Sequence, residues 1–416
     1  MSCSSAAPWP AIASVPRPHI GARLARLLFD QAARSVPVRV RYPDGRLVGG
    51  AADQYGASEF VVVRPAAFFS RLARDTKIGF GEAYMAGDWR AGDESDLADL
   101  LTPFAARMGS LVPRPVQRLR ALVDRPLPTE HENTVGGARS NIAAHYDLSN
   151  ELFAAFLDPT MTYSSAWFPE GSARASMADL EAGQLRKIDA MLDLARVRAG
   201  STVLEIGSGW GALAIRAAQR GARVLTVTLS QEQLDEARRR VAVQGLTDRV
   251  EVRLQDYRQV SGTFDAIVSV EMLEAVGEAY WPTYFAGLDR LLAPGGTAAI
   301  QTITMPHERV LATRRSFGWV QKYIFPGGLI PSLRLVEQTL GQHTGLQITA
   351  RRDLGLHYAD TLRVWRGQFL ANWPAIQGQG FDHTFRRMWE LYLAYSEAGF
   401  RSGYLDVSQL QLRRTA

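Results

Sequence analysis

The sequence predicts an α/β fold: a Rossmann-like, doubly wound and mainly parallel sheet, preceded by a small N-terminal α+β domain. Two observations carry this prediction. The first is a glycine-rich turn, residues 207–211, which follows a short apolar run and precedes residues 212–218, where apolar side chains recur at helical spacing. The second is that apolar runs recur at intervals that leave room for helices, at 202–206, 223–228, 250–254, 264–270 and 297–303.

Composition limits the class of protein. The 416 residues are 46% hydrophobic and 21% charged, which allows two or three domains with sizeable cores. The single cysteine, Cys3, excludes an intramolecular disulfide and a cysteine-based zinc site, and no metal is expected. No apolar run is long enough for a transmembrane helix, and the first 18 residues lack the features of a signal peptide. We therefore expect a cytoplasmic protein.

Three regions are expected along the chain: an accessory domain at 1–128, a linker at 129–140 and a main domain at 141–416. Within the accessory domain the patterns predict an amphipathic helix, two strands and a second helix, at 19–33, 36–42, 59–64 and 68–76. This domain shows no evident catalytic residues, so membrane docking and homodimer formation remain its alternative roles. In the main domain, residues 306–416 are rich in aromatics and are expected to form a mostly helical insertion or cap.

Charge favours an acidic partner only weakly. The formal net charge is +5, and most of the excess falls within residues 1–140. A basic face of this kind suits anionic lipid or nucleic acid, or serves solubility alone. Residues 107–128 combine arginines with apolar side chains, which fits either a membrane-contacting segment or a linker packed between domains.

The glycine turn indicates the cofactor. Its pattern is Glu205-x-Gly207-x-Gly209-x-Gly211, and glycines let a backbone approach a ligand closely. An acid two residues before the first glycine suits the amino group of a methionine moiety. The second strand does not end in the acid that a dinucleotide fold uses on the ribose. These features favour S-adenosylmethionine, and hence a methyltransferase, over NAD or FAD.

Several motifs then occur together and in order: residues 141–147, 161–168, the glycine turn, 255–258, 270–277 and 322–328. In combination they resemble the cyclopropane fatty acid synthases, including the mycolic acid cyclopropane synthases. The resemblance covers about residues 141–405. It implies a class I methyltransferase that alkylates a cis double bond in an unsaturated phospholipid acyl chain. It also implies a peripheral location at the inner face of the membrane.

The resemblance further implies the site. Four residues match positions that hold a bound bicarbonate and act in catalysis: Ser165, Glu274, Gln301 and Tyr358. Glu271 is the rival carboxylate, and His145 is expected to order a lid. The matched cofactor contacts are Tyr163, Ser164, Glu205, Gly207, Gly209, Gly211, Thr228, Leu229, Gln233, Gln255 and Tyr257, with Asp256 assigned to the adenine edge by analogy with general methyltransferases.

Two departures from the cyclopropane pattern bear on the product. Ser165 stands where those enzymes usually have Cys, and Gln301 where they usually have His. A glutamine forms hydrogen bonds but cannot carry the charge of a histidine. We expect the cation on the methylated chain to lose a proton from the new methyl when a ring closes, and from a neighbouring chain carbon when a methylene branch forms. Residues 301–305 look like actinobacterial enzymes that make methylene- or methyl-branched fatty acids.

The expected product is therefore a methylene-branched acyl chain, which a separate reductase would convert to a saturated methyl branch. Cyclopropane formation is the alternative. A catalytically inactive lipid-binding protein is a further alternative, because both Ser165 and Gln301 are altered. A nucleic-acid methyltransferase is disfavoured because the chain lacks an Asn-Pro-Pro-Tyr-type motif, so no nucleic-acid partner is expected.

Overall fold

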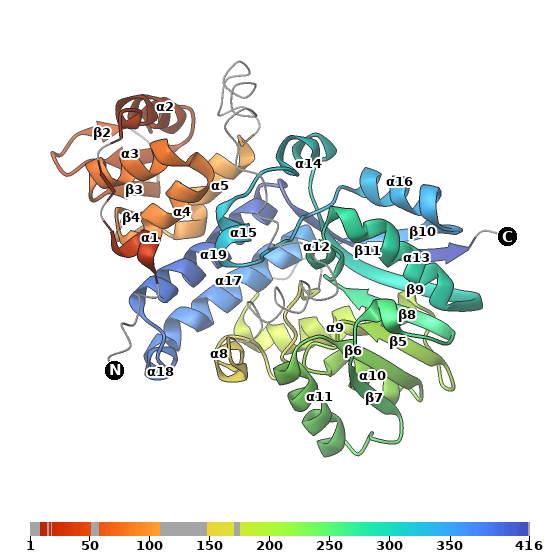
Figure 1. Ribbon diagram of the computed structural model, residues 1–416. Helices are drawn as coiled ribbons and strands as arrows, with labels where there is room; N and C mark the ends of the chain where they lie inside the picture. Colours follow the sequence, from red (N-terminus) through yellow and green to blue (C-terminus); the bar gives the residue numbers. More distant parts are fainter. Residues whose placement is uncertain are drawn as a thin grey trace, which may run out of the picture. The chain divides into compact units, whose positions relative to one another are not determined.

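Figure 1 shows the computed structural model, which describes residues 9–14, 16–17, 19–50, 58–108, 148–169 and 175–414. The predicted linker and His145 lie outside this part of the chain. The chain divides into two compact units. Unit 1 comprises Met1–Pro126, Arg315–Ile324 and Trp373–Ser402, and unit 2 comprises the rest. Two segments of the range predicted for the main domain therefore belong to unit 1.

Unit 1 contains a four-stranded sheet in the order β2-β1-β3-β4, in which β1 runs parallel to β3 and the other pairs are antiparallel. The strands are β1 (Val38–Arg41), β2 (Leu47–Val48), β3 (Ser58–Val62) and β4 (Trp89–Ala91). The helices are α1 (Pro10–Ala13), α2 (Ala22–Arg34), α3 (Pro65–Arg74), α4 (Thr76–Ala86), α5 (Leu97–Ala106), α15 (Trp319–Tyr323), α18 (Trp373–Gly378) and α19 (His383–Arg401).

Local sequence explains where the helices of unit 1 begin. Pro65 occupies the first turn of α3, where a missing N–H costs no hydrogen bond. The carboxylates of Asp75 and Asp96 accept backbone N–H groups at the starts of α4 and α5. The core is aromatic: Phe60 stacks on Trp89 with ring centroids 4.4 Å apart.

Unit 2 is built on a seven-stranded sheet in the order β10-β11-β9-β8-β5-β6-β7. The pairs from β9 to β7 are parallel, whereas β11 is antiparallel to both of its neighbours. The strands are β5 (Thr202–Ile206), β6 (Arg223–Thr228), β7 (Val250–Leu254), β8 (Phe264–Val270), β9 (Leu292–Thr304), β10 (Leu346–Asp353) and β11 (Asp406–Arg414). The predicted doubly wound, mainly parallel sheet is confirmed.

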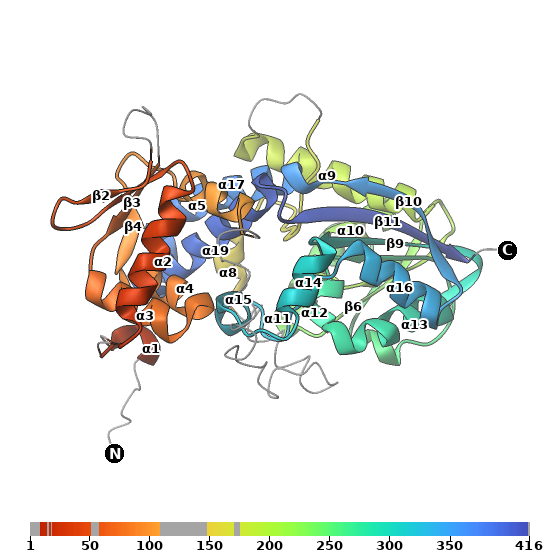
Figure 2. The same cartoon turned by 90° about the horizontal axis from the view of Figure 1, so that it is seen from above.

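Helices cover both faces of this sheet, and Figure 2 shows α9 on one side with α13 and α16 on the other. One core cluster joins α9, α10 and α11 to the sheet, and the second joins α13 and α16 to the opposite face. The helical segments of unit 2 are α8 (Asn150–Ala154), α9 (Met177–Leu194), α10 (Ala212–Gln219), α11 (Gln231–Val243), η2 (Tyr257–Gln259), α12 (Leu273–Val276), η3 (Glu278–Tyr280), α13 (Trp281–Leu291), α14 (His307–Thr313), α16 (Leu333–His343) and α17 (Gly355–Ala371).

The C-terminal region is mostly helical, as expected, but it also contributes two strands that were not predicted. Strands β10 and β11 join the main sheet as an antiparallel pair next to β9. In β11 the apolar Val407, Leu410 and Leu412 are fully buried, and so are the polar Ser408 and Gln409. Because polar residues occupy buried positions, the alternation that identifies a strand is weakened.

The topology of unit 2 fixes where a ligand can bind. The chain runs β5-β6-β7 outward and then returns to β8 on the other side of β5. The crevice outside the carboxyl ends of the strands at such a reversal is where ligands bind in open α/β sheets. None of the described helices is long and apolar enough to span a membrane.

Candidate active site

The glycine turn between β5 and α10 leaves open space at one position. Gly207, Gly209 and Gly211 all have positive φ, at 92°, 49° and 89°. A Cβ at Gly207 would lie 2.7 Å from the Met272 sulfur, so this glycine is required for packing. A Cβ at Gly209 would meet nothing within 4 Å. Of the three glycines, only Gly209 therefore has open space where a side chain would lie.

Glu205 lies one residue before the end of β5 and is 4% exposed. Its Oε2 atom has no hydrogen-bond partner among the described residues. Burial raises the pKa of the Glu205 carboxyl to about 8, against smaller opposing effects of Thr226 and the Lys187 charge. An unpartnered buried carboxyl oxygen is costly, and a cationic ligand group would satisfy it.

Two of the predicted cofactor contacts, Thr228 at the end of β6 and Gln233 on α11, are hydrogen-bonded to each other. The Thr228 hydroxyl donates to Oε1 of Gln233 over 2.9 Å, and both residues are buried. Leu229 follows and is partly exposed. Ser230 caps α11 and thereby fixes the position of Gln233 on the first turn of that helix.

The three cofactor contacts predicted after β7 have side chains with different partners. The side-chain amide of Gln255 donates to the backbone carbonyl of Gln259. The buried carboxylate of Asp256 accepts two hydrogen bonds from the Arg258 guanidinium, at 2.9 and 2.6 Å. The Tyr257 ring belongs to the core cluster that includes α13, and it packs edge-to-face on Tyr284 with ring centroids 5.6 Å apart.

Residues 163–165 line the site from the segment before α9. Tyr163 stacks on Trp365 with ring centroids 5.1 Å apart. The Ser164 hydroxyl accepts a hydrogen bond of 2.5 Å from Lys187, a residue of α9 that is 1% exposed. Burial lowers the pKa of Lys187 to about 8, although the charges of Glu271, Asp158 and Glu205 oppose this shift. Lys187 was not among the predicted site residues; the signal that could have identified it is a lysine on the buried face of an amphipathic helix.

Three of the four predicted catalytic residues converge on Glu271. One carboxylate oxygen accepts the Ser165 backbone N–H at 3.0 Å and the Gln301 side-chain amide at 2.8 Å. The other accepts the Tyr358 hydroxyl at 2.6 Å. The Ser165 hydroxyl itself donates to the backbone carbonyl of Ala166, so its backbone, not its side chain, faces the carboxylate.

A chain of hydrogen bonds orients Gln301. Its side-chain oxygen accepts from the amide of Gln409 at 3.1 Å, and the Gln409 oxygen accepts from Arg352 at 3.2 Å. Arginine can only donate, which sets the direction of both amides in turn. The NH2 group of Gln301 must therefore point at Glu271. The sequence analysis missed Gln409 because it expected no strand at β11.

Glu274 sits one turn further along, on α12, and is held separately. Its Oε1 accepts from the Thr302 hydroxyl at 3.0 Å and from the Ile303 backbone N–H. Its Oε2 is buried and has no partner among the described residues. Burial and then the neighbouring charge of Glu271 raise the pKa of the Glu274 carboxyl to about 8. Near neutral pH this carboxyl is therefore largely protonated.

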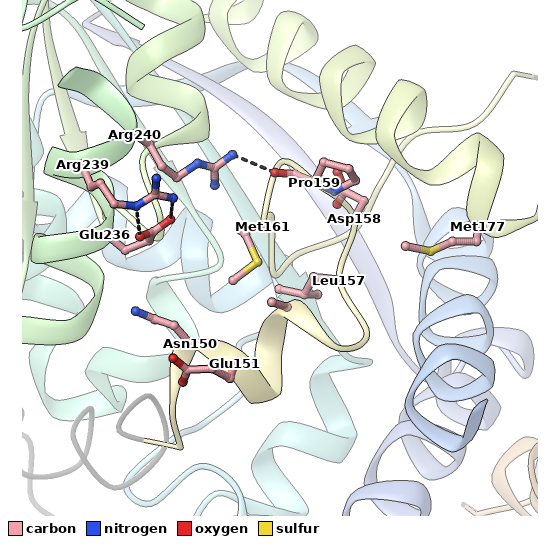
Figure 3. Close-up of a pocket in the computed structure, with 11 residues that line it drawn as sticks. Asn150, Glu151, Leu157, Asp158, Pro159, Met161, Met177, Glu236, Arg239 and Arg240 are labelled. Carbon is pink, nitrogen blue, oxygen red and sulfur yellow. Dashed lines mark hydrogen bonds and ion pairs between the residues drawn. The ribbon is translucent and has the colours of Figure 1, made fainter. Parts of the chain in front are cut away.

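A pocket of about 540 Å³ is lined by residues of α8, of the segment that follows it, and of α11 (Figure 3). Asn150 and Glu151 of α8, Met161, and Arg239 and Arg240 of α11 are among its lining residues. None of the residues predicted for the site lines it. In the described parts of the chain, no group of His, Cys, Asp and Glu side chains could hold a metal ion.

Comparisons with known proteins point the same way. The family described as mycolic acid cyclopropane synthetase matches residues 135–410. The chain is 52% identical over 411 residues to the tuberculostearic acid methyltransferase UfaA1 of Mycobacterium tuberculosis, covering 98% of this chain and 95% of that protein. It is 34% identical over 361 residues to the cyclopropane-fatty-acyl-phospholipid synthase of Escherichia coli, covering 83% and 86%. The crystal structure of mycolic acid cyclopropane synthase CmaA1 complexed with SAH and CTAB aligns with a TM-score of 0.60 and 31% identity, covering 66% of this chain and 97% of that one.

The buried Glu205 carboxyl predicts a pH-dependent stability. Its folded pKa of about 8 lies above its ordinary value of 4.5, so between these values the folded protein holds a proton that the unfolded chain has lost. This contribution is present below about pH 4.5 and is lost as pH rises through 8. Glu205→Gln does not titrate, so its stability relative to the parent should rise by about 1 kcal/mol per pH unit between pH 4.5 and 8.

Urea denaturation of the ligand-free protein at pH 5, 7 and 9 measures this difference. The gap between variant and parent should grow with pH. Glu308→Gln, which removes an exposed carboxylate, is the control. A gap that stays constant across the three pH values would contradict the assignment.

Proposed function

Because the chain belongs to the mycolic acid cyclopropane synthetase family, we propose that it transfers a methyl group from S-adenosylmethionine to the cis double bond of an unsaturated phospholipid acyl chain, leaving a methylene branch. The family expected from the motifs is confirmed. The observation that carries the proposal is the similarity to the tuberculostearic acid methyltransferase, which extends over nearly the whole of both chains.

The residues at the glycine turn fit the cofactor. The unpartnered Glu205 oxygen would accept a hydrogen bond from the amino group of the methionine moiety. At Gly209 there is open space in which the cofactor could approach the backbone closely. Thr228 and Gln233 would bound the ribose side. When bound, S-adenosylmethionine supplies an electrophilic methyl group on a positively charged sulfur. The protein must hold the alkene in line with that methyl and exclude water from the cation that results.

Atom balance corrects the expected route to the methylene branch. A ring and an exocyclic methylene both require loss of a proton from the new methyl group. Ring closure needs the positive charge on the carbon beside the methylated one. A methylene needs it on the methylated carbon, whose hydrogen must first move, with its electron pair, to the neighbour. Proton loss from a chain carbon would leave the double bond inside the chain, so that expectation was wrong.

The proposed catalytic residues have two different roles near the carbocation. Ser165, Gln301 and Tyr358 hold a carboxylate in place through three hydrogen bonds. Glu274 is the second carboxyl of the site and is mostly neutral near pH 7, because burial and the Glu271 charge raise its pKa to about 8. Conversion of the methylene to a saturated methyl branch needs a hydride and a proton, which a separate reductase would supply.

Helix α2 is the proposed contact with the lipid surface. Its exposed side carries Leu24, Leu27 and Leu28, 60%, 66% and 38% exposed, with the fully exposed Ile20 just before the helix. Arg23 and Arg34 flank this stripe and are exposed as well. An apolar stripe bordered by arginines fits an interface with anionic phospholipid, where the acyl substrate resides.

The product provides the test of the function. Purified protein, labelled S-adenosylmethionine and vesicles of oleoyl phosphatidylglycerol should yield label in lipid, and proton NMR of the esters should show exocyclic vinylidene signals. Upfield ring-methylene signals alone would support the cyclopropane alternative. Cofactor binding without any label in lipid would support the inactive lipid-binding alternative.

The glycine turn gives a second prediction. Gly209→Ala places a methyl group in the open space at the turn and should weaken S-adenosylmethionine binding by at least about tenfold, or 1.4 kcal/mol. Gly245→Ala is the matched control, because it also has a positive φ and open space but lies beyond the end of α11. Calorimetry on both variants decides: equal affinities would argue against cofactor at this turn.

The exposed leucines of α2 give a third prediction. Leu24→Gln combined with Leu27→Gln should lower activity on vesicles by at least about tenfold, because each buried leucine contributes about 1.5–3 kcal/mol at an apolar interface. Activity on detergent-dispersed lipid should be retained. Val243→Gln, at an exposed position of unit 2, is the control. If vesicle activity holds while the protein changes from dimer to monomer by size-exclusion chromatography, the homodimer role gains instead.

A further inference from the structure

The resemblance to cyclopropane synthases implies a bicarbonate held among Ser165, Glu274, Gln301 and Tyr358. In this structure Ser165, Gln301 and Tyr358 do not fit that arrangement. All three groups direct a hydrogen to the carboxylate of Glu271, over 3.0, 2.8 and 2.6 Å. A carboxylate and a bicarbonate present the same pair of acceptor oxygens. The donors that would hold the ion are therefore already engaged by a group of the same chemistry, built into the chain.

The orientation of Gln301 reinforces this disagreement. Its oxygen is occupied by Gln409, which is fixed in turn by Arg352. Its NH2 group thus has one direction available, toward a fully acceptor group such as a carboxylate. The hydrogen-bonding pattern reaches from β11 to the site and is complete with Glu271 in place.

The backbone at Glu271 also indicates a selected side chain. Its φ is +53°, in the left-handed region that favours glycine, directly after β8. Its N–H donates to the Gln301 carbonyl at 2.7 Å, which anchors that conformation. A non-glycine residue there costs about 1–2 kcal/mol. Glycine would suit the backbone better, so what is gained by a glutamate here is its carboxylate.

We propose that the Glu271 carboxylate is the resident base of the reaction and replaces bicarbonate. This inference rests on the proposed function. After the hydride shift, a Glu271 oxygen removes a proton from the new methyl group. The electrons of that C–H bond form the exocyclic double bond and neutralise the cation. Glu271 leaves the step as a carboxylic acid and returns its proton to solvent once product departs.

The surroundings suit this role. Burial raises the pKa of the Glu271 carboxyl above its ordinary value, although the hydrogen bonds from Tyr358, Ser165 and Gln301 oppose the shift. The base is thus stronger than an exposed carboxylate. The Lys187 charge favours the ionised form of Glu271, and the neighbouring Glu274 is mostly neutral near pH 7. One negative charge rather than two faces the reacting chain.

The test compares Glu271→Gly with Glu271→Gln under nitrogen, in buffer freed of carbon dioxide and then with added bicarbonate. The assay is transfer of label from S-adenosylmethionine to oleoyl phosphatidylglycerol vesicles. The wild type should be indifferent to bicarbonate. Both variants should lose at least about a hundredfold in rate, the scale for removing a catalytic acid–base group.

Bicarbonate should restore activity saturably to Glu271→Gly, which leaves room among the three donors. It should not restore Glu271→Gln, whose amide fills that space. Calorimetric S-adenosylmethionine affinity should match the wild type in both variants, which excludes misfolding.

Three results would overturn the inference: a wild type that needs bicarbonate, a Glu271→Gln variant within a few fold of wild type, or a Glu271→Gly variant that no bicarbonate concentration restores. In each of these the wild type still labels lipid in the presence of bicarbonate, so the proposed function stands. A wild type that labels no lipid under either condition would refute both.

Discussion

The site depends on one constraint: a carboxylate removed from water must be hydrogen-bonded, paired or protonated. Three glutamates meet this constraint at the carboxyl edge of one sheet, and each does so differently. Glu271 is held by three donors, whereas Glu274 and Glu205 each keep one buried oxygen without a partner in the described chain. Lys187 is the buried cation whose charge acts on Glu271 and Glu205. Burial raises the pKa of all three carboxyls, so what distinguishes these side chains is the hydrogen bonds that each accepts.

The main sheet fixes the positions of several of these side chains. Parallel strands deliver Glu205 and Glu271 to the same edge, and Gln301 lies opposite Val270 in the adjacent strand β9. The antiparallel strand β11 then places Gln409 directly opposite Gln301. Since the strands are hydrogen-bonded neighbours in a packed sheet, the amides cannot drift relative to the carboxylate. Sheet register therefore positions Gln301 and Gln409, whereas Glu271 and Ser165 lie outside the strands and depend on the local backbone there.

The strands of the main sheet could be predicted from the sequence more accurately than the arrangement of the site residues. Four of the five parallel strands have the predicted bounds, because apolar runs bounded by turn signals mark them clearly. The fifth, β9, begins at Leu292, five residues before the predicted start. Ser165, Gln301 and Tyr358 were expected together, and the structure does bring them together. They surround Glu271 and not Glu274, because a left-handed backbone at residue 271 redirects that side chain in a way no spacing rule describes. Strands β10 and β11 were missed because polar side chains at buried positions disguise the period of two.

Unit 1 is assembled from three separated stretches of chain, and this affects how the protein can be made and altered. Helix α19 packs against α4 and α5, and Lys322 of α15 pairs with Glu82 of α4. On the ribosome, unit 1 stays incomplete until residue 402 has emerged, late in synthesis. Removing the first stretch would take α4 and α5 away from α19, whose buried residues include Phe385, Trp389 and Tyr392. Because the segments of unit 1 alternate along the chain with those of unit 2, the two units are inherited together. Recombination at a single junction can neither add unit 1 nor remove it.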